Sequence, residues 1–187
     1  MLFRSKNKDK VGLILFSDHV EKFIAPKKDR SHILRVVREV LFHEPEGTGT
    51  SLQSGLDFLM NVAKRKSVVF LISDFLDDGY WKSLKLANKK HDMIGIRIAD
   101  PAESKLPDLG LIKVHDPETG EMFWANLSSE IERNTFSQSV MKKWETFEKE
   151  CGRSRFDVIN VGTDKDYVEP LMTYFRRREK RDRKSVV

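Results

Sequence analysis

Residues 67–74, SVVFLISD, are the stretch of sequence that decides the fold class. Val68 to Ile72 are apolar without interruption, and a short run of this kind predicts a strand that is buried on both faces. Two further apolar runs, VGLILF at 11–16 and MIGIRI at 93–98, have the same character. Such strands occur in parallel sheets that are covered by helices on both sides. The sequence therefore predicts an α/β fold with three layers and a doubly wound, mostly parallel, Rossmann-like sheet.

Amphipathic segments separate these strands. Apolar residues recur at helical spacing in five segments, which predicts helices at about 31–41, 50–66, 81–90, 128–150 and 167–175. Two hairpins are expected, one formed by 11–16 with 20–24 and one formed by 109–115 with 121–125 around a turn at 116–120. A last strand is expected at 156–161. The helix at 31–41 and the helix at 128–150 are expected to bury their apolar stripes.

The composition predicts one domain without covalent or metal reinforcement. The chain has 187 residues, of which 39% are hydrophobic, and a chain of this length can bury a substantial core. Its single cysteine, Cys151, excludes a disulfide framework and a cysteine-rich zinc site within one chain. No apolar run approaches the roughly 20 residues of a membrane span. We expect a cytoplasmic protein, with a single domain at 1–178 and a basic, disordered tail at 179–187.

The net charge of +5 is unevenly distributed. Residues 176–184 contain seven basic and two acidic side chains, so the positive charge is concentrated at one end of the chain. A nucleic-acid footprint requires lysine and arginine on a folded face. We therefore expect no nucleic-acid partner, and we expect residues 176–184 to be a solvated segment that the fold does not need.

Three aspartates follow apolar strands directly. Asp18, Asp74 and Asp100 each come just after the last apolar residue of a predicted strand. In open α/β sheets ligands bind beyond the carboxyl ends of the strands, and clustered carboxylates suit Mg²⁺. The alternative is that each aspartate caps the following turn or helix, which is the favoured interpretation for Asp100 because Pro101 follows it.

Thr50 also has two interpretations. The series Thr50-Ser51-Leu52-Gln53 fits a capping box, in which the threonine hydroxyl accepts a hydrogen bond from a backbone amide of the next helix. The hydroxyl could instead face the acidic edge and bind a metal. The sequence contains no GxSxG, P-loop, GxGxxG or HExxH motif, and its five histidines have no metal-ligand spacing.

The stretches at 11–42, 47–101 and 106–121, together with DYVEPLMTYFRRR at 166–178, resemble the family called domain of unknown function 58. The later part of that family is a von Willebrand factor A-like domain with a metal-ion-dependent adhesion site. The resemblance implies that Thr50 and Asp74 are the threonine and aspartate of this site. Ser73 and Asp18 are then possible accessory residues.

The chain departs from the family at one point. The family's DxSxS motif, which follows its first strand, occurs nowhere in this sequence. The resemblance therefore implies that the chain begins partway through the domain and carries an incomplete site. Mg²⁺ or another divalent cation would bind weakly to such a site, because Mg²⁺ requires nearly ideal octahedral coordination.

The resemblance implies a protein that is not an enzyme. It indicates a protein-interaction module that works with a MoxR-type AAA+ ATPase in the maturation or assembly of an unknown client protein. The alternative from the residues is a Mg²⁺-dependent phosphoesterase that uses Asp18, Asp74 and Asp100 as ligands. Arg97 is the one cation near these aspartates in sequence, and this scarcity argues against the phosphoesterase.

Overall fold

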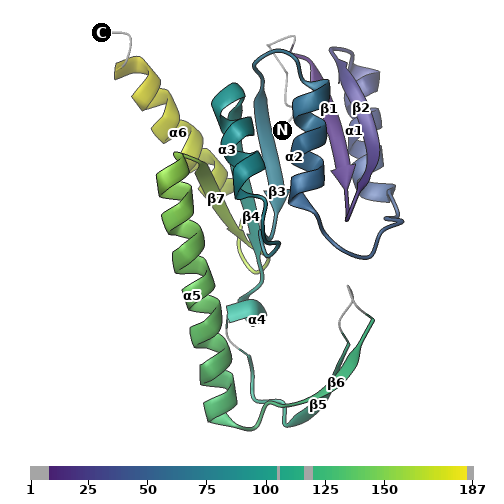
Figure 1. Cartoon of the computed structure of the whole chain (residues 1–187). Coiled ribbons are helices and arrows are strands. Elements are labelled where there is room, and N and C mark those ends of the chain that lie inside the picture. Colours follow the sequence, from purple (N-terminus) through teal and green to yellow (C-terminus); the bar gives the residue numbers. More distant parts are fainter. Residues whose placement is uncertain (1–8, 105, 116–119, 185–187) are drawn as a thin grey trace. The chain divides into compact units, whose positions relative to one another are not determined.

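The computed structural model describes residues 9–104, 106–115 and 120–184 (Figure 1). Its elements are β1 (Val11–Phe16), β2 (Val20–Lys27), α1 (Arg30–Phe42), α2 (Leu52–Val62), β3 (Val68–Ser73), α3 (Trp81–Lys90), β4 (Asp92–Ala99), α4 (Pro101–Ser104), β5 (Leu111–His115), β6 (Met122–Asn126), α5 (Glu130–Ser154), β7 (Asp157–Gly162) and α6 (Val168–Lys184). The predicted α/β class and both predicted hairpins are confirmed. Most of the turn predicted at 116–120 lies outside the described residues.

The strands form three sheets rather than the single sheet that the sequence predicted. β1 pairs with β2, the parallel sheet has the order β3-β4-β7, and β5 pairs with β6. The chain divides into two compact units, and the single domain over 1–178 stays a prediction. In the described residues the first unit comprises 9–64 and 77–84, and the second comprises 65–76, 85–104, 106–115 and 120–184. The physical reason is that β1 hydrogen-bonds only to β2, and β3 only to β4, within the described ranges.

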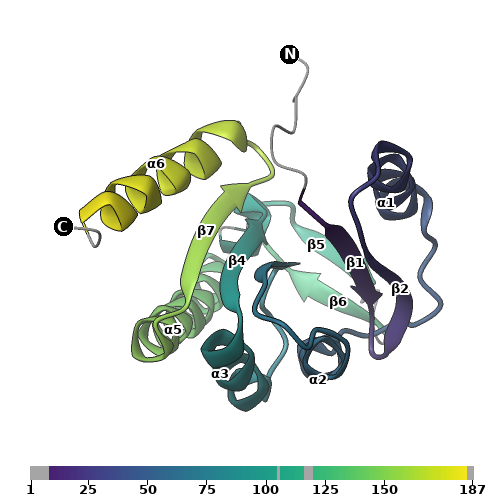
Figure 2. The same cartoon turned by 90° about the horizontal axis from the view of Figure 1, so that it is seen from above.

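The second unit has the predicted three layers, with its parallel sheet between helices (Figure 2). On one face, Ile94 of β4 and Ile159 and Val161 of β7 form a buried cluster against Leu171 and Tyr174 of α6. The opposite face of β4 meets α5. There the guanidinium carbon of Arg97 lies 3.1 Å from the centre of the Trp144 ring.

The helix α3 is attached to α5 by polar contacts. The Lys85 ammonium donates to Glu150 at 3.0 Å, and the Asn88 amide donates to the carbonyl of Ser154 at 3.0 Å. The aromatic ring of Phe75, which follows β3, lies 5.2 Å from that of Phe147 on α5. These contacts place α3 and α5 on the same side of the sheet.

The basic segment that was predicted to be disordered is largely helical. α6 continues to Lys184, so the structure places residues 179–184 in a helix, and 185–187 lie outside the described residues. Arg178 forms an ion pair with Asp92, and it donates to the hydroxyl of Tyr174 at 3.1 Å. The expectation that residues 176–184 are solvated is therefore wrong at Arg178, whose side chain is 22% exposed and pairs with a carboxylate of β4. That the fold does not need this segment stays a prediction.

In the first unit, α2 packs closely on the hairpin. A Cβ at Gly55 would lie 2.8 Å from a ring carbon of Phe16, so this approach of helix to strand requires glycine. The carboxylate of Asp77 accepts from the amide of Leu52 at 2.8 Å, and the Ser83 hydroxyl donates to Asp57 at 2.8 Å. The buried side chains Leu52 and Leu56, one turn apart on α2, form part of the core.

Two predicted apolar stripes are less buried than expected. On α1, the side chains of Leu34, Val37, Val40 and Leu41 are 47–69% exposed, although the helix itself forms as predicted. On α5, Ile131 is 80% exposed and Phe147 only 8%, so this helix buries its C-terminal half. Helical periodicity correctly predicted which apolar residues lie on one face of each helix, but it did not predict how much of that face is buried.

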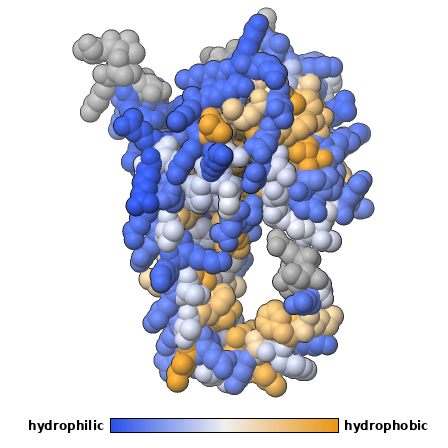
Figure 3. Space-filling model, in the orientation of Figure 1, coloured by the Kyte–Doolittle hydropathy of each residue, from blue (hydrophilic) through white to orange (hydrophobic). Residues whose placement is uncertain are grey.

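Apolar residues are also exposed on the hairpin β5–β6. Leu111, Met122, Phe123 and Trp124 are 53–66% exposed, and apolar side chains gather over this hairpin in Figure 3. No helix in the described ranges is long and apolar enough to cross a membrane.

Candidate functional site at the end of the first hairpin

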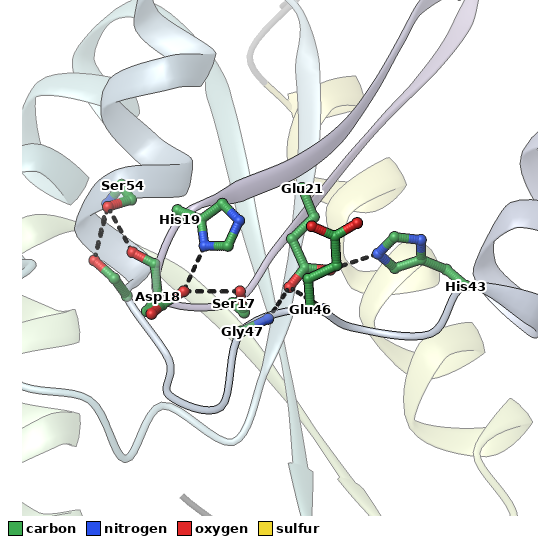
Figure 4. Close-up of polar contacts among 9 residues, drawn as sticks. Ser17, Asp18, His19, Glu21, His43, Glu46, Gly47 and Ser54 are labelled. Carbon is green, nitrogen blue, oxygen red and sulfur yellow. Dashed lines mark hydrogen bonds and ion pairs between the residues drawn. The ribbon is translucent and has the colours of Figure 1, made fainter.

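The candidate site of the first unit lies where β1 ends (Figure 4). Ser17 and Asp18 form the turn between β1 and β2, as the sequence predicted for a carboxylate just past an apolar strand. The segment 43–51, which joins α1 to α2, runs alongside this turn. The amide of Ser51 donates to the carbonyl of Ser17 at 2.7 Å, which ties the two segments together.

Glu21 is the centre of the polar network at this site. Its side chain is 3% exposed, and its Oε1 accepts from the amides of Glu46 at 3.1 Å and Gly47 at 3.0 Å. Its Oε2 lies 2.5 Å from Nε2 of His43. A buried carboxylate on β2 thus fixes the backbone of the loop that leads to Thr50.

Gly47 fits this network because it has no side chain. A Cβ at Gly47 would overlap the side chains of Ser17 and Asp18. The close approach permits the amide of Gly47 to reach Glu21. Glycine is therefore required here by space, not by an unusual backbone dihedral.

Thr50 does not cap α2 in the way that the capping-box pattern favoured. α2 begins at Leu52, and the N-cap is Ser51, whose Oγ accepts from the amide of Ser54 at 3.2 Å. Thr50 lies one residue earlier and is exposed. Its neighbours place it beside the β1–β2 turn, because a Cβ at Gly49 would lie 3.8 Å from the Cβ of Asp18.

Ser17, Asp18 and His19 resemble a catalytic triad in composition only. The hydroxyl of Ser17 donates to Oδ1 of Asp18 at 3.1 Å, and Nδ1 of His19 lies 2.5 Å from the same oxygen. The aspartate therefore holds both neighbours, and the hydroxyl does not bond to the imidazole as a nucleophile does to its base. The hydrogen bond from His19 is the main reason that the pKa of Asp18 is lowered, and the bond to Asp18 raises the pKa of His19.

The remaining predicted site residues belong to the second unit. The Ser73 hydroxyl donates to Oδ1 of Asp74 at 3.3 Å, and the same oxygen accepts from the amide of Leu76 at 3.1 Å. Asp74 thus closes a turn in which Phe75 has a left-handed φ of 59°. Thr50 and Asp74 lie in different units, and their proximity stays a prediction.

Asp100 has the capping role that the sequence favoured. Its carboxylate accepts from the hydroxyl of Thr163 at 2.7 Å and from the amide of Ala102 at 2.8 Å. The bond from Thr163, and secondarily that from Ala102, lowers the pKa of Asp100. The side chain therefore stabilises the start of α4 and its contact with the end of β7.

The residues of this site do not by themselves form a cation site. In the described residues, no three histidine, cysteine, aspartate or glutamate side chains converge where they could hold a metal ion. Asp18 already bonds to Ser17 and His19 through one oxygen, and Glu21 is engaged by two amides. The donor set around Thr50 is therefore short of the octahedral shell that Mg²⁺ requires.

Sequence reasoning missed the residues that organise the site. Glu21, His43 and Gly47 were not predicted, because Glu21 lies on an alternating strand where a glutamate usually faces water. The short, glycine-containing loop at 44–49 was the only signal, and it does not indicate which side chain the loop amides contact.

The stability of the loop is expected to depend on pH through Glu21. Hydrogen bonds from Ser17, the Gly47 amide and His43 lower the pKa of this carboxyl from 4.5 to about 2. A lowered folded-state pKa stabilises the fold above the unfolded-state value. We therefore expect this contribution to be complete above pH 4.5 and to be lost as the pH falls toward 2.

Amide hydrogen exchange of residues 46 and 47 between pH 5 and pH 2.5 would measure this loss, after correction for the intrinsic rate. In Glu21→Gln the protection is expected to be lower at pH 5 and to depend less on pH. Equal pH profiles in the two proteins would contradict the assignment.

Comparison with known proteins identifies the family. The profile of the family described as "Protein of unknown function DUF58" matches residues 1–146. The chain belongs to the DUF58 family. This DUF58 chain is 22% identical over 155 residues to an uncharacterized protein of Mycobacterium avium, MAV169, covering 82% of the chain and 90% of that protein.

Longer relatives also match the DUF58 chain. It is 19% identical over 175 residues to the uncharacterized proteins Mb1516 of Mycobacterium bovis and Rv1480 of Mycobacterium tuberculosis. The match covers 92% of the chain but only 55% of each relative. Among solved structures, an aerotolerance-related membrane protein from Bacteroides fragilis matches with a TM-score of 0.49 and 14% identity, over 85% of this chain and 75% of that one.

Proposed function

We propose that this DUF58 chain is a protein-interaction module, without covalent chemistry of its own, that works with a MoxR-type AAA+ ATPase. The von Willebrand factor A-like character implied by the sequence resemblance suggests the class of partner. The observation that carries the proposal is the Glu21 network, because it holds residues 43–51 against the hairpin with Thr50 and Asp18 both exposed. A fixed loop loses less conformational entropy on binding than a mobile one.

The surface formed by the β1–β2 turn and residues 43–51, called the acidic edge below, suits a partner surface with hydrogen-bond donors. Asp18, Glu44 and Glu46 are exposed acidic side chains, and Thr50 adds a hydroxyl. The proposal does not require Mg²⁺, because the described residues around Thr50 do not complete its octahedral shell. The experiment therefore measures binding with and without the cation. The proposal includes a cytoplasmic location, where the ATPase and its nucleotide would be available.

The test measures binding of the purified chain to the purified MoxR-type ATPase of the same organism, with ATP, in Mg²⁺ and in excess chelator. Gly47→Ala should displace the loop and weaken binding by about tenfold or more, which is the effect of losing about 1.4 kcal/mol. Gly152→Ala is the matched control, because a Cβ there meets nothing within 4 Å.

If Gly47→Ala and the wild type bound the ATPase with equal affinity, the acidic edge would not be the binding surface. A parallel assay of phosphate-ester hydrolysis with Mg²⁺ and Mn²⁺ tests the phosphoesterase alternative. Turnover that Asp74→Asn or Asp100→Asn abolishes would favour that enzyme over the interaction module.

A further inference from the structure

A basic cavity lies in the second unit at the amino ends of β3 and β4. Its volume is about 650 Å³, within the range of roughly 300–1,000 Å³ that is typical of small-molecule sites. Six cationic side chains line it: Lys66, Lys85, Lys89, Arg153, Arg155 and Arg178. They come from the start of β3, from α3, from the end of α5 and from α6. This end of the sheet is opposite to the strand ends that carry Asp74 and Asp100.

Carboxylates compensate only part of this charge. Glu150 pairs with Lys85 at 3.0 Å and with Arg153 at 2.7 Å, and Asp92 pairs with Arg178. In the part of the chain that the structure describes, no carboxylate lies within ion-pair distance of Lys66, Lys89 or Arg155. Cations gathered in a hollow repel one another and attract a mobile anion.

Two buried polar side chains in the wall of the cavity have no hydrogen-bond partner in the part of the chain that the structure describes. His91 is 2% exposed, and neither of its ring nitrogens is bonded within the described residues. The hydroxyl of Ser154 is likewise buried and unbonded among these residues. Buried polar groups in folded proteins are nearly always hydrogen-bonded, so each exception requires an explanation. Burial, and then the adjacent Lys90, lowers the pKa of His91, which leaves a neutral ring with one N–H donor.

Helix electrostatics explains only some of the cations. Lysine and arginine are favoured in the last turn of a helix, which accounts for Lys89 on α3 and Arg153 on α5. It does not account for Lys66, which precedes β3, or for Arg178 in the middle of α6. Arg155 follows α5 with a left-handed φ of 49°, a conformation that favours glycine.

We propose that this cavity binds a small anion with at least two phosphate groups. Lys66, Lys89 and Arg155 supply positive charge that no carboxylate among the described residues pairs with, and His91 and Ser154 supply hydrogen-bond donors that no described residue uses. A multivalent anion is the ligand class because the cations come from four separate elements, and a single phosphate would not bridge them all. Arginine and lysine both bind phosphate oxygens through charge-assisted hydrogen bonds.

The test uses tripolyphosphate as the probe, with isothermal titration of the full chain at 50 mM and 150 mM salt. One saturable site is expected, with a Kd of about 100 μM or tighter at the lower salt. Arg155→Gly removes a charge at a position where glycine suits the backbone, so this variant should fold. It and Lys66→Gln should each weaken binding by about tenfold. Lys143→Gln, an exposed change on α5, is the matched control and should have no effect.

Two further arms identify the source of the phosphate. Orthophosphate should bind at least about tenfold more weakly than tripolyphosphate if several cations share the ligand. Vesicles of phosphatidylcholine, with and without a phosphoinositide bisphosphate, test a lipid headgroup, and binding that Arg155→Gly weakens would assign the phosphates to a lipid. The side-chain ¹⁵N signals of His91 should shift when tripolyphosphate saturates the protein. If no saturable site is found, or if Arg155→Gly and Lys143→Gln bind the probe equally, the proposal is wrong.

Discussion

Replacing Ile94 with alanine is expected to lower the free energy of unfolding by about 3 kcal/mol, within the range of roughly 2–5 kcal/mol for such truncations of buried side chains. Ile94 is 1% exposed and belongs to the cluster with Ile159 and Val161. Leu171 and Tyr174 of α6 pack against this cluster. Because side chains from three elements surround the site, the lost volume cannot be refilled by one neighbour.

Urea unfolding followed by far-UV circular dichroism would measure the change. Val68→Ala is the matched control on the same sheet, since Val68 is 58% exposed and its truncation should cost less than about 0.5 kcal/mol. A loss for Ile94→Ala as small as that for Val68→Ala would show that α6 does not seal this face of the sheet.

Gly95→Val should destabilise the protein by about 2–3 kcal/mol, through the opposite face of the same strand. A Cβ at Gly95 would lie 2.8 Å from a ring carbon of Phe156 and 3.1 Å from a methyl of Val158. Phe156 is 4% exposed, so its ring has little room to move. Glycine here lets the segment after α5 approach β4 closely.

Gly152→Ala is a control that is expected to raise the free energy of unfolding, where Gly95→Val lowers it. Gly152 lies within α5, and a Cβ there meets nothing within 4 Å. Alanine in a helix interior is favoured over glycine by about 0.5–1 kcal/mol, so this variant should be more stable than the wild type. Thermal melts would compare the two variants with the wild type. A lower melting temperature is expected for Gly95→Val because of steric overlap, and a higher one for Gly152→Ala because the unfolded chain has less freedom. If Gly95→Val melted at or above the wild type, the close packing of Phe156 on β4 would be disproved.

Both candidate sites depend on contacts between residues that are far apart in the sequence. Asp18 was predicted from a local feature, its place just after an apolar strand, whereas Thr50 was implied as a site residue by the family resemblance and its capping pattern favoured the other interpretation. Glu21 was missed because its partners, His43 and Gly47, are more than twenty residues away. The basic cavity was missed for the same reason, since Lys66 and Arg178 are separated by more than a hundred residues.

Local sequence also misjudged the C-terminal segment. Its charge predicted a solvated tail, and the structure instead extends α6 through most of it. Arg178 reaches Asp92, and Arg181 lies 3.5 Å from Asp157, so carboxylates on two strands meet the basic helix. Charge composition describes how much charge a segment has, but the partners of that charge depend on which strands lie beside it.

The sequence alone determined the α/β class, the positions of most strands and helices, and both hairpins. These features follow from apolar runs, helical periodicity and turn residues, which act over a few neighbours along the chain. Tertiary structure decided which strands share a sheet, which apolar faces are covered, and which distant side chains form a site. Leu34 and Ile94 are both apolar residues on regular elements, yet one is 61% exposed and the other 1%. That difference depends on contacts between segments far apart in sequence, and no local pattern specifies them.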